Sequence, residues 1–187
     1  MNVLAISGSL RLGASNTSLL EAAARVAPAG IVVNRYPSIA VLPHFNPDDD
    51  TFDQSTLPEV VAEFRRLIGE ADALLLSTPE YAHGLPGSFK NALDWLVGST
   101  EFPGKPVAII SPSARSTYAQ AQLREILKTM SAHIVESASV VVALPKREMD
   151  VDDIVADEEL TKALRSVFAA LAAFFLHGLM LPGDTRA

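Results

Sequence analysis

Residues 73–95 read Ala73-Leu-Leu-Leu-Ser-Thr-Pro-Glu-Tyr-Ala-His-Gly-Leu-Pro-Gly-Ser-Phe-Lys-Asn-Ala-Leu-Asp-Trp95, and they predict a strand, a loop and a helix in succession. The opening apolar run, Ala73 to Ser77, is short and uninterrupted, which is typical of a strand buried on both faces of a parallel sheet. Pro86 is expected in the first turn of the helix, because its missing N–H removes no helical hydrogen bond there. The helix is predicted to end near Gly98.

The loop between this strand and helix is a candidate binding site. In a doubly wound sheet, ligands bind beyond the carboxyl ends of the strands, where loops lead into the next helices. The loop from Pro79 to Gly84 has that position and carries Glu80, Tyr81 and His83. Gly84 would let the backbone approach a ligand closely. The alternative is that Pro79 and Tyr81 pack a turn while His83 lies on the surface.

Strand-like and helix-like segments alternate along the whole chain. Apolar runs predict strands at residues 3–6, 31–33, 73–77, 105–111 and 134–144. Helix-period patterns lie between them, and a final helix begins at Asp157. This alternation predicts one three-layer α/β sandwich that spans residues 1–187, without repeats.

Two smaller patterns precede the central strand. Thr56 and Glu59 have the spacing of a capping box at the start of a helix. The acidic run Asp48, Asp49 and Asp50 lacks the alternate spacing of a calcium loop, so it is interpreted as a solvated turn.

Composition limits the classes of function. The 187 residues are 49% hydrophobic and 20% charged, which are values of a globular chain. The absence of cysteine excludes disulfides, thiolate metal sites and a cysteine nucleophile, so redox chemistry would need a cofactor. A net charge of -7 disfavours nucleic acid and anionic membranes as partners. No segment has the roughly twenty apolar residues of a membrane span, and no signal peptide is recognisable, so we expect a cytoplasmic protein.

A second candidate site, residues 7–18, follows the first strand. It contains two glycines, several hydroxyl side chains and Arg11, whose guanidinium fork suits phosphate oxygens. The helix expected to open near Asn16 or Thr17 would point its N–H groups into this loop. The alternative is an ordinary connection with Ser15 or Asn16 as N-cap, and both interpretations can hold together. The glycine spacing does not match G-x-G-x-x-G, and no P-loop lysine follows, so a mononucleotide phosphate fits better.

These two stretches together resemble the NADPH-dependent FMN reductase family of flavodoxin-like proteins, which includes quinone, chromate and azo-dye reductases. The residues that carry the resemblance are Gly8-Ser-Leu-Arg11, Ser15-Asn16, Pro79-Glu-Tyr81, Pro86-Gly87 and Lys90-Asn-Ala-Leu-Asp-Trp95. The resemblance implies a five-stranded parallel sheet of order 2-1-3-4-5, with FMN and NADPH or NADH as cofactors. It also implies a homodimer or homotetramer.

The resemblance assigns residues to each part of FMN. The phosphate would be held by Ser9, Arg11, Ser15, Asn16, Thr17 and Ser18. The isoalloxazine ring would be lined by Pro79, Glu80, Tyr81, Ala82, His83 and Gly84, with Ser113 reaching it from the loop after the fourth strand. That loop contains no glycine, unlike its family counterpart, and its Arg115 is either a nucleotide-phosphate contact or a solvated side chain.

The resemblance assigns structural roles to the helix after the binding loop. Asn91 or Asp94 is expected to bond loop backbone, and Trp95 is expected to pack at an interface.

The leading hypothesis is an FMN-dependent oxidoreductase that passes hydride from NAD(P)H through N5 of FMN to a quinone-like or other small acceptor. No side chain is assigned as a catalytic acid or base, and no metal is expected. The alternatives are a flavodoxin-type electron carrier without NAD(P)H turnover, and a phosphate-binding module without flavin.

Overall fold

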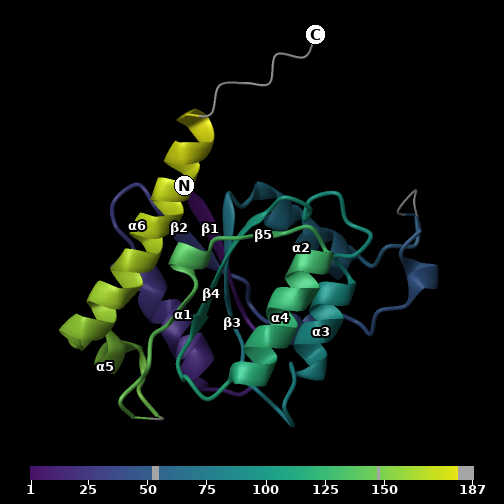
Figure 1. Cartoon of the computed structure of the whole chain (residues 1–187). Helices are drawn as coiled ribbons and strands as arrows, with labels where there is room; N and C mark the ends of the chain where they lie inside the picture. The colour runs from purple at the N-terminus through teal and green to yellow at the C-terminus, as the bar shows by residue number, and fades with distance from the viewer. Residues whose placement is uncertain (52–54, 147, 181–187) are drawn as a thin grey trace.

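The computed structural model describes residues 1–51, 55–146 and 148–180, and it is a parallel sheet between two layers of helices (Figure 1). The strands are β1 (Asn2–Ser7), β2 (Val32–Arg35), β3 (Ala73–Ser77), β4 (Pro106–Ser111), β5 (His133–Ile134) and β6 (Val140–Val141). Their order is β2-β1-β3-β4-β5, and β6 also pairs with β4. The predicted α/β class and strand order are therefore confirmed.

The predicted fifth strand is divided in two by the 3-10 helix η3 (Glu136–Ala138). β5 pairs with β4 where His133 lies opposite Pro106 and Ile134 lies opposite Val107. β6 pairs with β4 further along, where Val140 lies opposite Ile110. Between the two, the Ser139 hydroxyl accepts a hydrogen bond from Ile109 N at 3.1 Å, which replaces a ladder bond. The expected one-sided edge is present, since Val142 is buried whereas Val141 is exposed.

The two faces of the sheet carry separate hydrophobic cores because strand side chains alternate between faces. On one face, Leu4, Leu74 and Ile109 pack against α2 (Glu59–Glu70), α3 (Gly87–Asp94) and α4 (Thr117–Thr129). On the other, Val3, Leu75 and their neighbours pack against α1 (Ser15–Val26), α5 (Val151–Ala156) and α6 (Glu158–Met180). No helix in the described ranges is long and apolar enough to cross a membrane.

The predicted capping box at Thr56 is wrong. α2 begins after Pro58, which makes no side-chain cap, and the Thr56 hydroxyl instead donates to Asp48 O at 3.3 Å. A capping box does occur at α5, where the Asp150 side chain accepts from Asp153 N at 2.9 Å.

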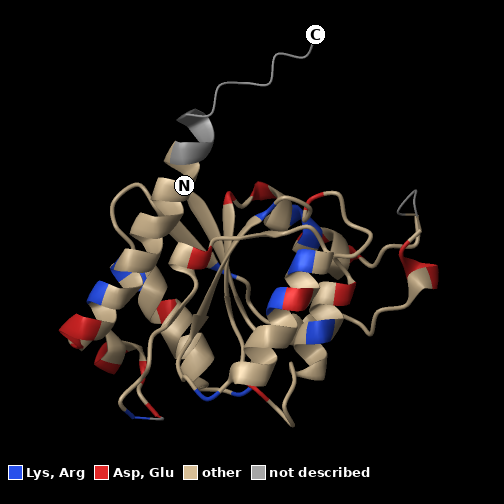
Figure 2. Ribbon diagram, viewed as in Figure 1, with Lys and Arg blue, Asp and Glu red and all other residues tan. Residues whose placement is uncertain are grey.

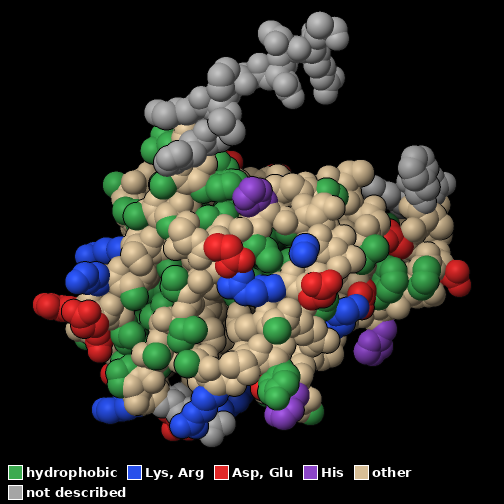
Figure 3. All heavy atoms as spheres, in the orientation of Figure 1, with side chains coloured by type: hydrophobic (Ala, Val, Ile, Leu, Met, Phe, Trp, Pro, Cys, Tyr) green, Lys and Arg blue, Asp and Glu red, His purple; other side chains and the backbone are tan. Residues whose placement is uncertain are grey.

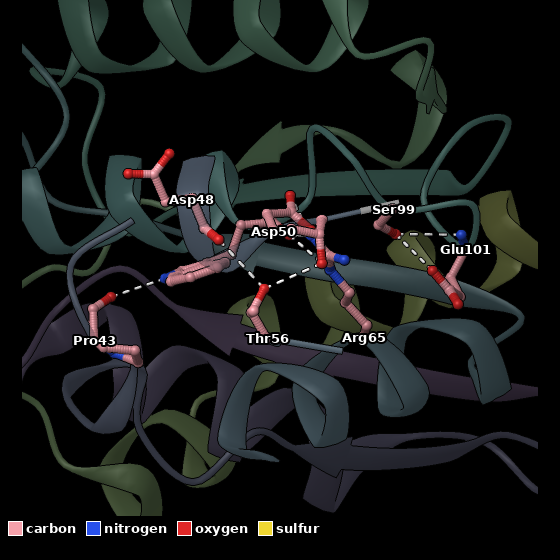
Figure 4. Close-up of polar contacts among 9 residues, drawn as sticks. Pro43, Asp48, Asp50, Thr56, Arg65, Ser99 and Glu101 are labelled. Atoms are coloured by element: carbon pink, nitrogen blue, oxygen red, sulfur yellow. Dashed lines mark hydrogen bonds and ion pairs between the residues drawn. The ribbon is translucent and has the colours of Figure 1, made fainter. Parts of the chain in front are cut away.

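The acidic run is not simply a solvated turn. Two of its residues belong to the 3-10 helix η2 (Pro47–Asp49), but the third, Asp50, is 9% exposed and pairs with Arg65 at 2.8 Å. Figure 4 shows the two side chains pointing toward one another. The Arg65 side chain is 3% exposed and also donates from Nε to Trp95 O at 2.8 Å. Gly98 leaves room for the carboxylate, since a Cβ there would be 3.3 Å from Asp50 Cγ.

Trp95 lies in the core and is fully buried within the chain, so the expected interface role is not needed to explain it. Its Nε1 donates to Pro43 O at 2.8 Å. Asn91 donates to the same oxygen and accepts from Phe45 N, both at 2.8 Å. Asn91 therefore bonds loop backbone as predicted, whereas Asp94 pairs with Lys90.

Candidate functional site

The candidate site is a cavity of about 660 Å³ at the carboxyl end of the sheet. Its walls are the segments that follow β1, β3, β4 and β6, which the strand order brings to one edge. The volume is within the usual range of small-molecule sites, about 300 to 1,000 Å³. The lining residues are Ser9, Arg11, Ala14, Ser15, Asn16, Pro79, Glu80, Tyr81, Pro112, Ser113, Ala114, Arg115, Ser116, Ala143, Leu144 and Lys146.

The wall after β1, residues 8–14, is shaped by its own serine side chains. Ser9 N donates to Ser7 Oγ at 3.2 Å, and Arg11 N donates to Ser9 Oγ at 3.3 Å. α1 begins at Ser15, and its N-cap residue, Ala14, makes no side-chain cap. The expectation that Ser15 or Asn16 is the N-cap is therefore wrong, and the uncapped end of α1 faces the cavity.

Asn16 and Thr17 tie α1 to the strand ends. The Ser77 hydroxyl donates to Asn16 Oδ1 at 2.9 Å, which joins the first turn of α1 to the end of β3. Thr17 Oγ1 lies 2.9 Å from Ser7 Oγ at the end of β1. These bonds fix the helix terminus against both strands, so the geometry of this wall is set before any ligand arrives.

The wall after β3 is a tight hairpin. Tyr81 and Gly84 exchange both backbone hydrogen bonds at 3.0 Å, around the two residues Ala82 and His83. These two have φ of 49° and 58°, the left-handed region that a type I′ turn requires. The turn directs Tyr81 to the cavity and His83 toward Tyr118. The rings of His83 and Tyr118 are stacked, with their centroids 4.1 Å apart.

Gly84 lies close to the side chain of Gln122. A Cβ at this position would be 3.2 Å from Gln122 Oε1, which accepts a hydrogen bond from Leu85 N at 2.7 Å. The glycine therefore makes room for Gln122, and Gly84 does not line the cavity described above.

The wall after β4 is held in place by Glu80 and by serines. Glu80 Oε2 accepts from Ala119 N at 2.9 Å and so caps the first turn of α4 from the neighbouring loop. Ser113 N donates to Ser111 Oγ at 3.4 Å, and Arg115 N donates to Ser113 Oγ at 3.2 Å. In this glycine-free loop, serine hydroxyls bond the backbone as they do after β1.

Positive charge gathers in this cavity although the chain is acidic overall. Arg11, Arg115 and Lys146 line it, whereas Glu80 is the acidic residue in its lining and is engaged with α4. Arg11 Nη2 lies 3.8 Å from Glu148 Oε1, and both side chains are largely exposed. Figure 2 shows blue segments, with some red ones among them, in the loops at the lower end of the sheet, opposite the N-terminus. The cavity therefore suits an anionic ligand.

The structure brings most of the predicted site residues together. The cavity is lined by Ser9, Arg11, Ser15, Asn16, Pro79, Glu80, Tyr81 and Ser113. Thr17, Ser18, Ala82, His83 and Gly84 lie beside it and do not line it, and Ser18 is buried in the first turn of α1. Lys146 was missed, because no local pattern marks a lysine after the last strand. Within the described ranges, no group of three acidic or histidine residues has the arrangement of a metal site.

Fold and cavity together define a flavodoxin-like nucleotide-binding protein. A sheet of order 2-1-3-4-5 places its ligand at the β1/β3 switch point, where this cavity lies. An uncapped helix N-terminus with an arginine suits a phosphate, and open walls of proline, tyrosine and serine suit a planar ring. The residues present therefore fit FMN.

The chain belongs to the NADPH-dependent FMN reductase family, whose model matches residues 1–145. It is 33% identical over 176 residues to an NAD(P)H-dependent FMN reductase of Pseudomonas aeruginosa, covering 91% of this chain and 93% of that protein. It is 33% identical over 158 residues to a quinone reductase of Escherichia coli, covering 80% and 81%. Among solved structures, the flavoenzyme NAD(P)H:(acceptor) oxidoreductase FerB of Paracoccus denitrificans matches with a TM-score of 0.72 and 29% identity, covering 94% and 98%.

Proposed function

We propose that this chain is an FMN-dependent NAD(P)H oxidoreductase that reduces a quinone-like or other small acceptor. The observation that carries the proposal is one cavity with an arginine and an uncapped helix N-terminus on its first wall and a tyrosine hairpin on its second. Relatives of similar length are named FMN reductase and quinone reductase, which supports the same chemistry.

The residues around the cavity have distinct tasks toward FMN. The phosphate would be held by Ser9, Arg11, Ser15 and Asn16, with Thr17 and Ser18 supporting the helix turn behind them. The ring would lie against Pro79, Tyr81 and Ser113, and bound FMN would supply reversible hydride transfer at its N5 atom. The strained turn at Ala82 and His83 would fix the angle at which Tyr81 meets the ring.

The protein contributes position and electrostatics rather than acid or base catalysis. Arg11 and the α1 N-terminus would neutralise the phosphate, and Glu80 would hold the β4 wall through its bond to Ala119 N. Tyr81 is 56% exposed, so the cavity opens to solvent on this side. The open side would admit the nicotinamide nucleotide and then the acceptor.

Turnover with and without cofactor tests the proposal. Protein loaded with FMN is expected to oxidise NADPH when a benzoquinone is present, and protein stripped of FMN is expected to be inactive. Bound FMN without NADPH oxidation would favour a flavodoxin-type electron carrier. No binding of FMN would leave a phosphate-binding protein with another ligand.

We further propose a homodimer or homotetramer in the cytoplasm, in line with the family resemblance. Exposed apolar residues such as Val97, Val141 and Leu176 offer surface for such contacts. Figure 3 shows hydrophobic side chains, in green, scattered over the face that it draws. Light scattering that gives the mass of one chain would contradict the oligomer.

A further inference from the structure

Two cations of the cavity lie outside the phosphate loop. Arg115 lines the cavity from the segment between β4 and α4, and Lys146 lines it from the segment after β6. Both residues are exposed, and in the ranges that the structure describes neither forms an ion pair. Within the described ranges, the positive charges of these two side chains are therefore not neutralised by an ion pair.

Backbone hydrogen bonds bring these two segments together. β6 pairs with β4 at Ser111 and Val141, and the pairing continues beyond both strands. Val142 N donates to Ser111 O at 2.8 Å, and Leu144 N donates to Pro112 O at 3.0 Å. The segments that carry Arg115 and Lys146 therefore leave the sheet side by side.

Arg11 approaches the cavity from a different strand. It follows β1, and β3 lies between β1 and β4 in the sheet. Because adjacent strands are about 4.8 Å apart, the ends of β1 and β4 are separated by roughly 10 Å. An anion at the α1 N-terminus and an anion beside Arg115 would thus occupy different parts of the cavity. The segment that follows Lys146 turns toward Arg11, because Arg11 Nη2 lies 3.8 Å from Glu148 Oε1.

We propose that Arg115 and Lys146 form a second anion subsite, which binds a phosphate of the nicotinamide dinucleotide, while Arg11 binds the phosphate of FMN. This inference rests on the proposed function, because it requires both ligands to share the cavity. FMN carries one phosphate, for which Arg11 and the α1 N-terminus already provide. The reducing nucleotide brings a pyrophosphate and, in NADPH, a 2′-phosphate. With a net charge of -7, the chain attracts such a ligand only through locally placed cations.

The double variant Arg115→Gln with Lys146→Gln tests the subsite. Its matched control is Lys162→Gln with Arg165→Gln, which removes the same charge from exposed positions on α6, away from this cavity. Two quantities are measured on FMN-loaded protein: the KM for NADPH and for NADH, and the Kd for adenosine 2′,5′-bisphosphate by calorimetry. The Kd for FMN is measured on stripped protein by fluorescence titration.

We expect the double variant to raise the KM for NADPH about tenfold or more, the size of a lost charge-assisted hydrogen bond, with an unchanged Kd for FMN. If the KM for NADH stays constant and binding of the bisphosphate weakens, the group bound is the 2′-phosphate. If the KM rises equally for both nucleotides, it is the pyrophosphate. The control should alter none of these values.

Two results would overturn the subsite. An equal loss of FMN affinity would assign both cations to FMN, and unchanged values throughout would make them ordinary solvated side chains. Wild-type protein that neither binds FMN nor oxidises NADPH would instead remove the proposed function itself, and the two failures are thus distinguishable.

Discussion

Gly8 lies directly against Thr78, so a Cβ at position 8 would be 2.8 Å from Thr78 Cβ and closer still to Thr78 Oγ1. Gly8 N also donates to Ser77 O at 2.8 Å. This contact joins the loop after β1 to the loop after β3, the two walls assigned to the phosphate and the ring. Glycine at position 8 is thus required by close approach within the chain.

Gly8→Ala is predicted to destabilise the protein by about 1 to 3 kcal/mol, the usual cost of overpacking, and to weaken FMN binding by separating the two walls. Gly87→Ala is the control, because a Cβ there meets nothing within 4 Å and the residue begins α3. Urea unfolding and an FMN titration measure both effects. Equal behaviour of the two variants would show that the contact is unimportant.

Arg11→Ala is predicted to weaken FMN binding by about 1.5 to 3 kcal/mol, the contribution of a charge-assisted hydrogen bond. Riboflavin, which lacks the phosphate, should bind the variant and the wild type alike. Parallel titrations with the two flavins measure this difference. Unchanged FMN affinity would remove Arg11 from the phosphate site.

The Asp50–Arg65 pair is predicted to be a major source of stability for the long segment before α2. Asp50→Ala should lower the free energy of unfolding by about 3 kcal/mol or more, because it leaves a buried guanidinium without its carboxylate. Arg66→Ala is the neighbouring control, since Arg66 pairs with Glu63 and Glu70 on the exposed face of α2 and should matter little. Similar losses in both variants would contradict the assignment.

Ala82→Asn is predicted to stabilise the protein by about 0.5 to 1 kcal/mol, because asparagine tolerates the left-handed conformation better than alanine. Ala29→Asn, at an exposed alanine without positive φ, should bring no such gain. Chemical denaturation of both variants makes the comparison. A loss of stability in Ala82→Asn would show that the alanine methyl group is needed where it lies.

Tyr36 is predicted to make stability depend on alkaline pH. Burial, with the nearby Glu63 carboxylate, raises the pKa of the Tyr36 phenol above its ordinary value of 10.0. The unfolded chain therefore loses this proton first, so the free energy of unfolding should fall as pH rises above about 10. Tyr36→Phe should show a smaller fall in denaturation measured between pH 8 and 11. Identical pH profiles would contradict the shift.

The periodic parts of the fold were predictable, and the parts fixed by distant contacts were not. Uninterrupted apolar runs mark β1, β3 and β4, because both faces of each strand are buried. The interruption between β5 and β6 depends on the Ser139 hydroxyl bonding Ile109, a partner 30 residues away. Asp50 is buried for the same kind of reason, since Arg65 and the space left by Gly98 lie far from it in sequence.

The candidate site also has residues that the sequence predicts and residues that it does not. Ser9, Arg11 and Pro79 to Tyr81 follow strand ends in recognisable patterns, and they line the cavity as a group. Lys146 carries no such pattern, because only the pairing of β6 with β4 brings its segment to the cavity. Ala82 and His83 form a turn that is usually made by asparagine and glycine, so their positive φ could not be predicted from the sequence.

The central claim is that this cavity holds FMN in a form that NAD(P)H reduces. The direct measurement follows the visible absorbance of FMN bound to the purified protein, without oxygen, as NADPH is added. The account predicts rapid bleaching that a benzoquinone reverses, and slower bleaching in the Arg115→Gln and Lys146→Gln double variant. Bound flavin that keeps its colour under excess NADPH would contradict the account.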